Sequence, residues 1–73
     1  MLLSDCSINS RCEIVSINLP NDETIRLCEL GLSKGTKLKI CQLCPFGSVL
    51  VSKGTERIGL SSQITNLLEV KYI

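Results

Sequence analysis

The fold of this chain is decided by residues 26–38, which read RLCELGLSKGTKL. The first part predicts the end of a short helix, which Asn21 or Asp22 caps at its start. Gly31 permits the left-handed backbone conformation that ends a helix, and Leu32 is placed to close over that end. The apolar residues at helical spacing before this stop are Ile25, Leu27, Cys28 and Leu30.

The second part of the same stretch predicts a change from helix to strand. Residues 33–36 read SKGT, which is typical of a tight turn. Residues 37–40 then alternate polar and apolar, as a half-buried strand does, so we expect a strand over about residues 36–43. A short helix therefore leads directly into a strand.

The rest of the chain predicts further short strands separated by close turns. Residues 11–17 alternate with Cys12 and Ile14 on one face, which indicates a strand. Residues 61–66 predict a single helical turn with Ser62 as its cap. The remaining expected strands contain Val49 and Val51, Ile58 and Leu60, and Leu68 and Val70. Five short strands predict a mainly β fold in the form of a small, partly open barrel.

Composition narrows the class of protein. A chain of 73 residues with 44% hydrophobic residues predicts one small domain over residues 1–73, and 3% aromatic residues predict an aliphatic core. The net charge is +1 and the cations are spread along the chain, so we expect no nucleic acid partner. No stretch approaches the roughly 20 apolar residues of a membrane-spanning helix, so we expect no direct membrane insertion and a cytoplasmic location.

The cysteines offer the sharpest chemical feature. Cys41 and Cys44 form a C-x-x-C pair, which can give two thiolates to one metal. A structural zinc site usually needs four Cys or His ligands, and the chain has five cysteines and no histidine. Cys6, Cys12 and Cys28 would have to converge on the pair, whereas Cys12 and Cys28 are expected on core faces. We therefore expect packing first, metal binding by Cys41 and Cys44 as the alternative, and no cofactor.

Enzymatic chemistry is not indicated by the sequence. Without histidine, acid–base work would fall on other side chains, and no two carboxylates are spaced to suggest a shared site. Gly31 and Gly35 are not followed by the Gly-Lys-Ser/Thr ending of a phosphate-binding loop. We expect neither catalysis nor binding of GTP by this chain.

The order of several blocks resembles the FeoA family over residues 3–70. The blocks are a leading Leu3-Ser4-Asp5, the RLCELGL run at 26–32, Gly35, Pro45-Phe46-Gly47, residues 49–54, Ile58-Gly59-Leu60 and Leu68-Glu69-Val70. The resemblance implies an SH3-like barrel of about five strands with one short inserted α-helix. It also implies a cytosolic accessory of ferrous iron uptake that is not an enzyme and that binds the GTP-dependent ferrous iron permease. A free-standing relative of the similar barrel found in iron-dependent repressors is the other alternative that it leaves open.

The chain departs from the family pattern in two places. Ser61 and Ser62 stand where members commonly carry basic residues, which removes charge from one face. Asn9 stands where many members have glycine, and asparagine tolerates a positive φ. The first departure implies that an arginine contact made there would be missing.

A partner surface is expected where the helix end and the Pro45-Phe46 turn meet, if the barrel brings the two together. The residues expected to form it are Arg26, Leu30, Leu32, Pro45 and Phe46. The competing interpretation is that Leu30 and Leu32 close one end of the barrel.

Overall fold

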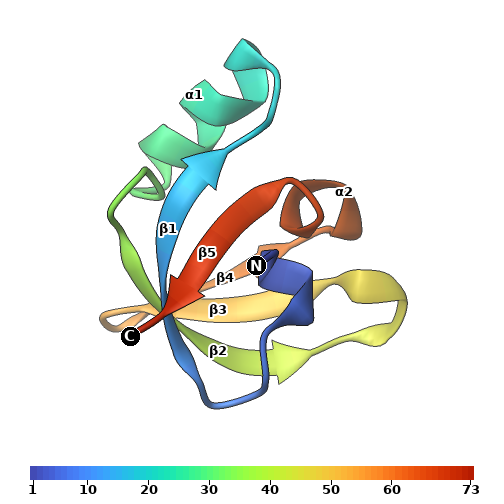
Figure 1. Ribbon diagram of the computed structural model, residues 1–73. Helices are drawn as coiled ribbons and strands as arrows, with labels where there is room; N and C mark the ends of the chain where they lie inside the picture. Colours follow the sequence, from blue (N-terminus) through green and yellow to red (C-terminus); the bar gives the residue numbers. More distant parts are fainter.

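The computed structural model describes residues 1–73, and its five strands form one antiparallel sheet that curls into a small barrel (Figure 1). The strands are β1 (Arg11–Ile17), β2 (Lys37–Leu43), β3 (Val49–Lys53), β4 (Glu56–Leu60) and β5 (Leu68–Tyr72). Their order across the sheet is β4-β3-β2-β1-β5. The predicted mainly β fold of five strands is confirmed, and β1 has the predicted bounds.

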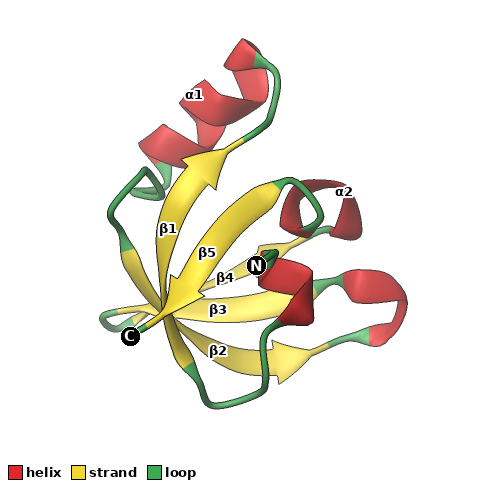
Figure 2. Cartoon of the chain, in the orientation of Figure 1, coloured by secondary structure: helices red, strands yellow, loops and turns green.

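The helices lie in the connections between strands (Figure 2). α1 (Asn21–Glu29) joins β1 to β2, and α2 (Ser62–Thr65) joins β4 to β5. Two single 3-10 turns, η1 (Leu3–Asp5) and η2 (Pro45–Gly47), precede β1 and β3. None of these helices has the length and apolarity needed to cross a lipid bilayer.

The core is aliphatic, as predicted, and alternate residues of the strands point into it. Tyr72 and Phe46, the two aromatic residues, are both exposed. The buried hydrophobic residues are Leu3, Cys6, Cys12, Ile14, Leu27, Leu32, Leu38, Ile40, Val49, Val51, Leu60, Leu68 and Val70. The predicted burial of Cys12 and Ile14 on β1 is confirmed.

The end of α1 has the hydrogen bonds of a Schellman motif. Gly31 has a φ of 84°, and its N–H donates to the carbonyl of Cys28 at 2.9 Å. The N–H of Leu32 donates to the carbonyl of Leu27 at 2.8 Å, and both leucine side chains are buried. The predicted glycine stop and the closure by Leu32 are therefore confirmed.

The start and the apolar face of α1 differ from the prediction. The N-cap is Pro20, whose carbonyl accepts the first helical bond from Thr24, so Asn21 and Asp22 are already inside the helix. Proline fixes φ near the value that this turn requires, and no side chain is needed to cap it. Of the four expected apolar residues only Leu27 is buried, and the other three, Ile25, Cys28 and Leu30, are exposed.

The expected core face was wrong because α1 projects away from the barrel and has only one buried residue, Leu27 (Figure 1). The expected cap of α2 was also wrong, because its N-cap is Ser61 instead of Ser62, and the Ser61 side chain makes no capping hydrogen bond.

Candidate functional site

The turn η2 presents Phe46 to solvent. Its side chain is 96% exposed, and its backbone is left-handed with φ 64° and ψ 22°. This conformation favours glycine, and a bulky residue there is a strained exception. Neither core packing nor backbone preference therefore accounts for a phenylalanine at this position.

Hydrogen bonds hold this turn in place. The N–H of Cys44 donates to the carbonyl of Ser48 at 2.9 Å and closes the base of the turn. The hydroxyl of Thr65, a fully buried residue of α2, donates to the carbonyl of Gly47 at 2.8 Å. Phe46 is thus presented by a turn that is tied to the next helix.

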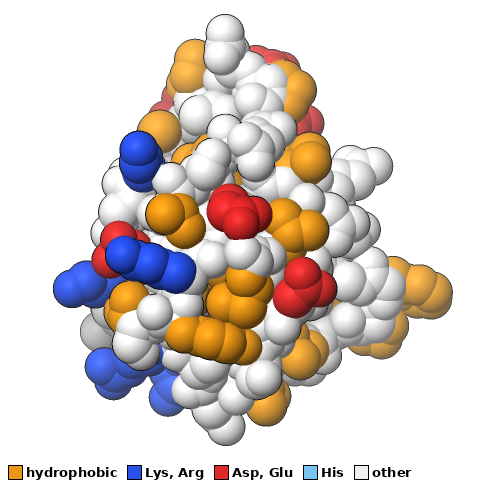
Figure 3. Space-filling model, viewed as in Figure 1, with side chains coloured by type: hydrophobic (Ala, Val, Ile, Leu, Met, Phe, Trp, Pro, Cys, Tyr) orange, Lys and Arg blue, Asp and Glu red, His pale blue; other side chains and the backbone are white.

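Leu43, Pro45 and Phe46 form an exposed apolar projection, which we call the apolar tip. Figure 3 shows hydrophobic side chains at the edge of the molecule where η2 projects. Beside the tip lies a hollow of about 310 Å³ that has no charged residue in its lining. It is lined by Gln42, Cys44, Ser48, Val49, Leu50, Gly59, Leu60 and Ser61. Ser61, one of the two departures from the family pattern, therefore faces this uncharged hollow.

The structure does not unite the five residues expected to form one partner surface. Leu32 is completely buried and belongs to the core, so it cannot contact a partner in this fold. Arg26 and Leu30 are exposed at the end of α1, whereas Pro45 and Phe46 lie in η2, on another side of the barrel (Figure 1). The sequence placed these residues together because it does not reveal where the barrel directs each turn.

Cys41 lies within β2, Cys44 directly follows the strand, and both are half-buried free thiols. Between Ile40 and Gln42 the register with β3 shifts, so Cys41 is the extra residue of a β-bulge. No group of three or more Cys, His, Asp or Glu side chains in residues 1–73 could hold a metal ion. The C-x-x-C spacing therefore does not build a complete protein metal site here.

Cys6 and Cys12 are a different kind of pair, buried inside the barrel. Burial raises the pKa of Cys12 to about 11, and the neighbouring Cys6 thiol adds to this rise. Burial also raises the pKa of Cys6. These thiols stay protonated near neutral pH, which makes them poor nucleophiles and poor metal ligands.

One surface feature was missed from the sequence. Cations that are dispersed along the chain lie together on the outer face of the sheet, at Arg11, Lys37 and Lys39, around a second hollow of about 320 Å³. In the sequence these cations are dispersed, so their grouping on this face was not predicted. The alternation of Lys37 and Lys39 around Leu38 was the available signal, but it gives no strand register.

Solved structures with the same fold define the class. The solved FeoA of Stenotrophomonas maltophilia, in complex with zinc, is described as a prokaryotic SH3 domain protein; this chain matches it with 28% identity and a TM-score of 0.76, covering 97% of this chain and 89% of that one. The fold is therefore an SH3-like barrel. The family model for the FeoA domain matches residues 1–72, and the chain belongs to the FeoA family.

Two further solved structures are similar over the whole of this chain. The FeoA protein of Chlorobium tepidum is 26% identical with a TM-score of 0.89, and this chain spans 70% of it. Iron(II) transport protein A of Clostridium thermocellum is 23% identical with a TM-score of 0.89, and this chain spans only 46% of that chain. No curated protein sequence matches significantly.

Proposed function

We propose that this chain is a non-enzymatic accessory protein of bacterial ferrous iron uptake. It acts in the cytoplasm by binding the cytosolic GTP-binding domain of the ferrous iron permease. Membership of the FeoA family supports the role in iron uptake, and the Stenotrophomonas maltophilia relative is described as a candidate activating factor of ferrous iron transport. The mechanism is contact between two proteins, without catalysis.

The observation that carries this proposal is the exposed, left-handed Phe46 beside an uncharged hollow. Interfaces concentrate their affinity in a few aromatic residues that fill a pocket on the partner. The projecting phenylalanine can enter a pocket on the partner, and the adjacent hollow can receive a side chain from the partner. We therefore assign permease binding to the apolar tip, with Arg26 and Leu30 on α1 as the competing surface.

The test is a titration of the purified, reduced protein against the cytosolic domain of the host permease. Phe46→Ala is expected to weaken binding at least about tenfold, because an anchoring aromatic is lost. Leu30→Ala is the matched variant on the competing surface, and Ile8→Ala removes an equally exposed aliphatic side chain from a turn that belongs to neither surface.

The assignment to the tip requires that only Phe46→Ala among these three variants lowers the affinity. A loss confined to Leu30→Ala would move the contact to the end of α1. Absence of saturable binding by the unchanged protein would overturn permease binding itself. Metal content measured on the same sample shows whether Cys41 and Cys44 hold Zn or Fe, which the proposal does not expect.

A further inference from the structure

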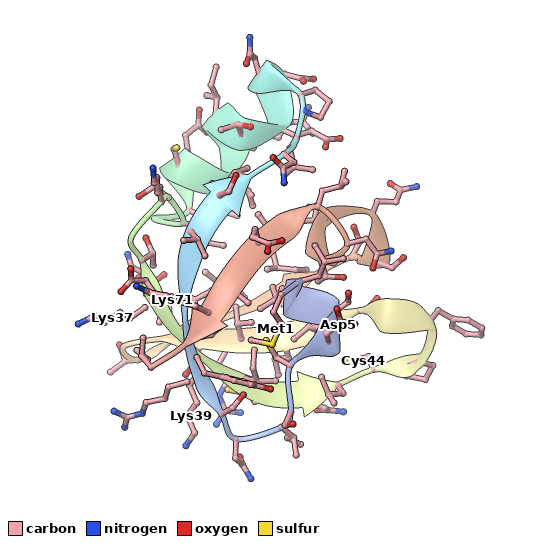
Figure 4. All side chains as sticks on the ribbon, viewed as in Figure 1. Met1, Asp5, Lys37, Lys39, Cys44 and Lys71 are labelled. Carbon is pink, nitrogen blue, oxygen red and sulfur yellow. The ribbon has the colours of Figure 1, made fainter.

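The strand register gathers cations into one row on the outer face of the sheet. Arg11 of β1 lies directly opposite Lys39 of β2, Lys39 lies opposite Ser52 of β3, and Ser52 lies opposite Arg57 of β4. Directly opposite residues share a face, with Cβ atoms about 4.5–5.5 Å apart. We call Arg11, Lys37, Lys39 and Arg57 the cationic face; Figure 3 shows basic side chains gathered on one side of the molecule, and Figure 4 labels Lys37 and Lys39 there.

These cations have no acidic partner of their own. The two ion pairs of the molecule join the Met1 amino group to Glu69 and Lys71 to Glu13, the second at 3.9 Å. Glu13 lies opposite both Lys37 and Lys71, but only Lys71 is within ion-pair distance. Like charges directly opposite each other destabilise a sheet, so the fold gains nothing from placing Arg11 against Lys39.

A hollow lies among these charges. It has a volume of about 320 Å³ and is lined by Arg11, Lys37, Leu38, Lys39, Ser52, Gly54 and Ile73. Its two apolar lining residues are Leu38, whose side chain is buried in the core, and Ile73, whose side chain is exposed. Ser52 adds a hydroxyl, and nothing stands within 4 Å of the position that a Cβ would take at Gly54. Such a lining matches a ligand that carries carboxylates and apolar groups side by side.

We propose that the cationic face binds an acidic segment of a partner protein, in which Asp or Glu alternates with apolar residues. Arg11 and Lys39 contact the carboxylates, and the hollow takes an apolar side chain between them. Arginine is well suited to this role because its planar guanidinium pairs with a carboxylate through two parallel hydrogen bonds. This inference goes beyond the proposed function, because it concerns a different face and does not require that the partner be the permease.

Charge complementarity favours a polypeptide over the other polyanions. Single-stranded nucleic acid is bound through aromatic platforms, whereas Phe46 lies in η2 and the Tyr72 hydroxyl accepts a hydrogen bond from the N–H of Ser7 at 3.0 Å. Stable anchoring to an anionic membrane needs a second signal besides a basic patch, and the exposed apolar tip lies on another side of the barrel (Figure 1). A local cluster on a nearly neutral protein suits a local acidic ligand.

The experiment uses a fluorescein-labelled peptide of about twelve residues that alternates Asp or Glu with Leu, at low salt. The control peptide carries Asn and Gln in place of Asp and Glu. We expect saturable binding of the acidic peptide only. The double variant Arg11→Gln/Lys39→Gln is expected to weaken it at least about tenfold, and about 0.5 M NaCl to weaken it similarly.

The matched control is Arg26→Gln/Lys34→Gln, which removes the same two residue types from the helix and the following turn. It is expected to change the affinity less than about twofold, because these cations lie outside the row. The charge-keeping swap Arg11→Lys/Lys39→Arg is expected to retain most of the binding. All four altered residues are exposed, so the fold should tolerate these changes.

Equal losses in the two double variants would overturn the proposal, because the peptide would then be sensing only net charge. The proposal also fails if the unchanged protein ignores the peptide. Vesicles containing phosphatidylglycerol and a short DNA duplex are the remaining probes. Binding to either of these in the absence of peptide binding assigns the face to that polyanion instead.

Discussion

The hollow beside the apolar tip and the hollow on the cationic face are nearly equal in volume, about 310 and 320 Å³, but they differ in their lining. The first has no charged residue and stands next to an exposed phenylalanine. The second is bordered by three cations and has no acidic residue in its lining. One small barrel thus offers two surfaces of different chemistry.

Because their chemistry differs, the two surfaces can make different contributions to binding. Burial of an aromatic anchor supplies affinity and slows dissociation, whereas surface charges mainly increase the association rate and set the orientation. The tip lies at η2, and the labelled lysines Lys37 and Lys39 lie on another side of the barrel (Figure 4). A partner or partners can therefore occupy both at once.

The first prediction compares two leucines of β2, one buried beneath the cationic face and one exposed in the apolar tip. Leu38 is buried under the cationic face, whereas Leu43 is 46% exposed in the apolar tip. Leu38→Ala should lower the free energy of unfolding by about 2–5 kcal/mol, because it leaves a cavity in the core. Leu43→Ala should change it by about 0.5 kcal/mol or less.

Urea unfolding of both variants, followed by circular dichroism, provides the measurement. Similar losses in the two variants would contradict the comparison, because the tip would then be part of the folded core. Leu43→Ala is expected to affect permease binding instead, in the titration that tests Phe46→Ala.

The two surfaces also differ in what the sequence could predict. The tip could be anticipated, because Pro45 and Phe46 are adjacent and a turn was expected around them. The cationic face could not, because Arg11, Lys39 and Arg57 are far apart in the chain and meet only through the register of four strands. That register includes a bulge at Cys41, for which the sequence carries no clear signal.

The helix α1 also shows what could and what could not be predicted from the sequence. Local hydrogen bonding fixes its end, so Gly31 and Leu32 were predicted correctly. The burial of its apolar residues depends on tertiary contact, and Ile25, Cys28 and Leu30 face solvent because α1 projects from the barrel. For the same reason the expected patch of helix end and Pro45-Phe46 turn does not form.

A second prediction concerns the core thiol beneath the cationic face. Cys12 follows Arg11 on β1, and burial raises its pKa to about 11 from an ordinary value of 9.0. The unfolded chain therefore ionises this thiol first, so its stabilising contribution is complete below about pH 9 and is lost as the pH rises towards 11. The loss should be on the order of 2–3 kcal/mol.

The measurement is denaturant unfolding under reducing conditions at several pH values between about 8 and 11. This range covers the pH at which the thiol ionises in the unfolded and in the folded chain. Other groups titrate in this range, so the informative quantity is the difference from Cys12→Ala, which should lack this part of the loss. Cys28→Ala, altered at an exposed position, should keep it. Equal pH dependence of all three proteins would show that the buried thiol does not titrate as the structure implies.

A third prediction distinguishes the effect of Phe46 on stability from its effect on binding. Phe46 has a φ of 64°, and a residue with a Cβ is strained there, whereas glycine adopts this conformation readily. Phe46→Gly should therefore raise the free energy of unfolding by about 0.5–1 kcal/mol relative to Phe46→Ala, which removes the ring but keeps the Cβ. Both variants should bind the permease domain equally weakly, because both lack the aromatic ring.

This pair of variants gives the sharpest test of why the tip carries a phenylalanine. Thermal unfolding measures stability, and the permease titration measures binding on the same samples. If the glycine variant is more stable while binding is lost, the aromatic ring is maintained against the preference of the backbone, as a binding residue would be. If the two variants are equally stable, the left-handed backbone of Phe46 is not strained. The assignment of binding to the tip then depends on exposure and on the neighbouring hollow alone.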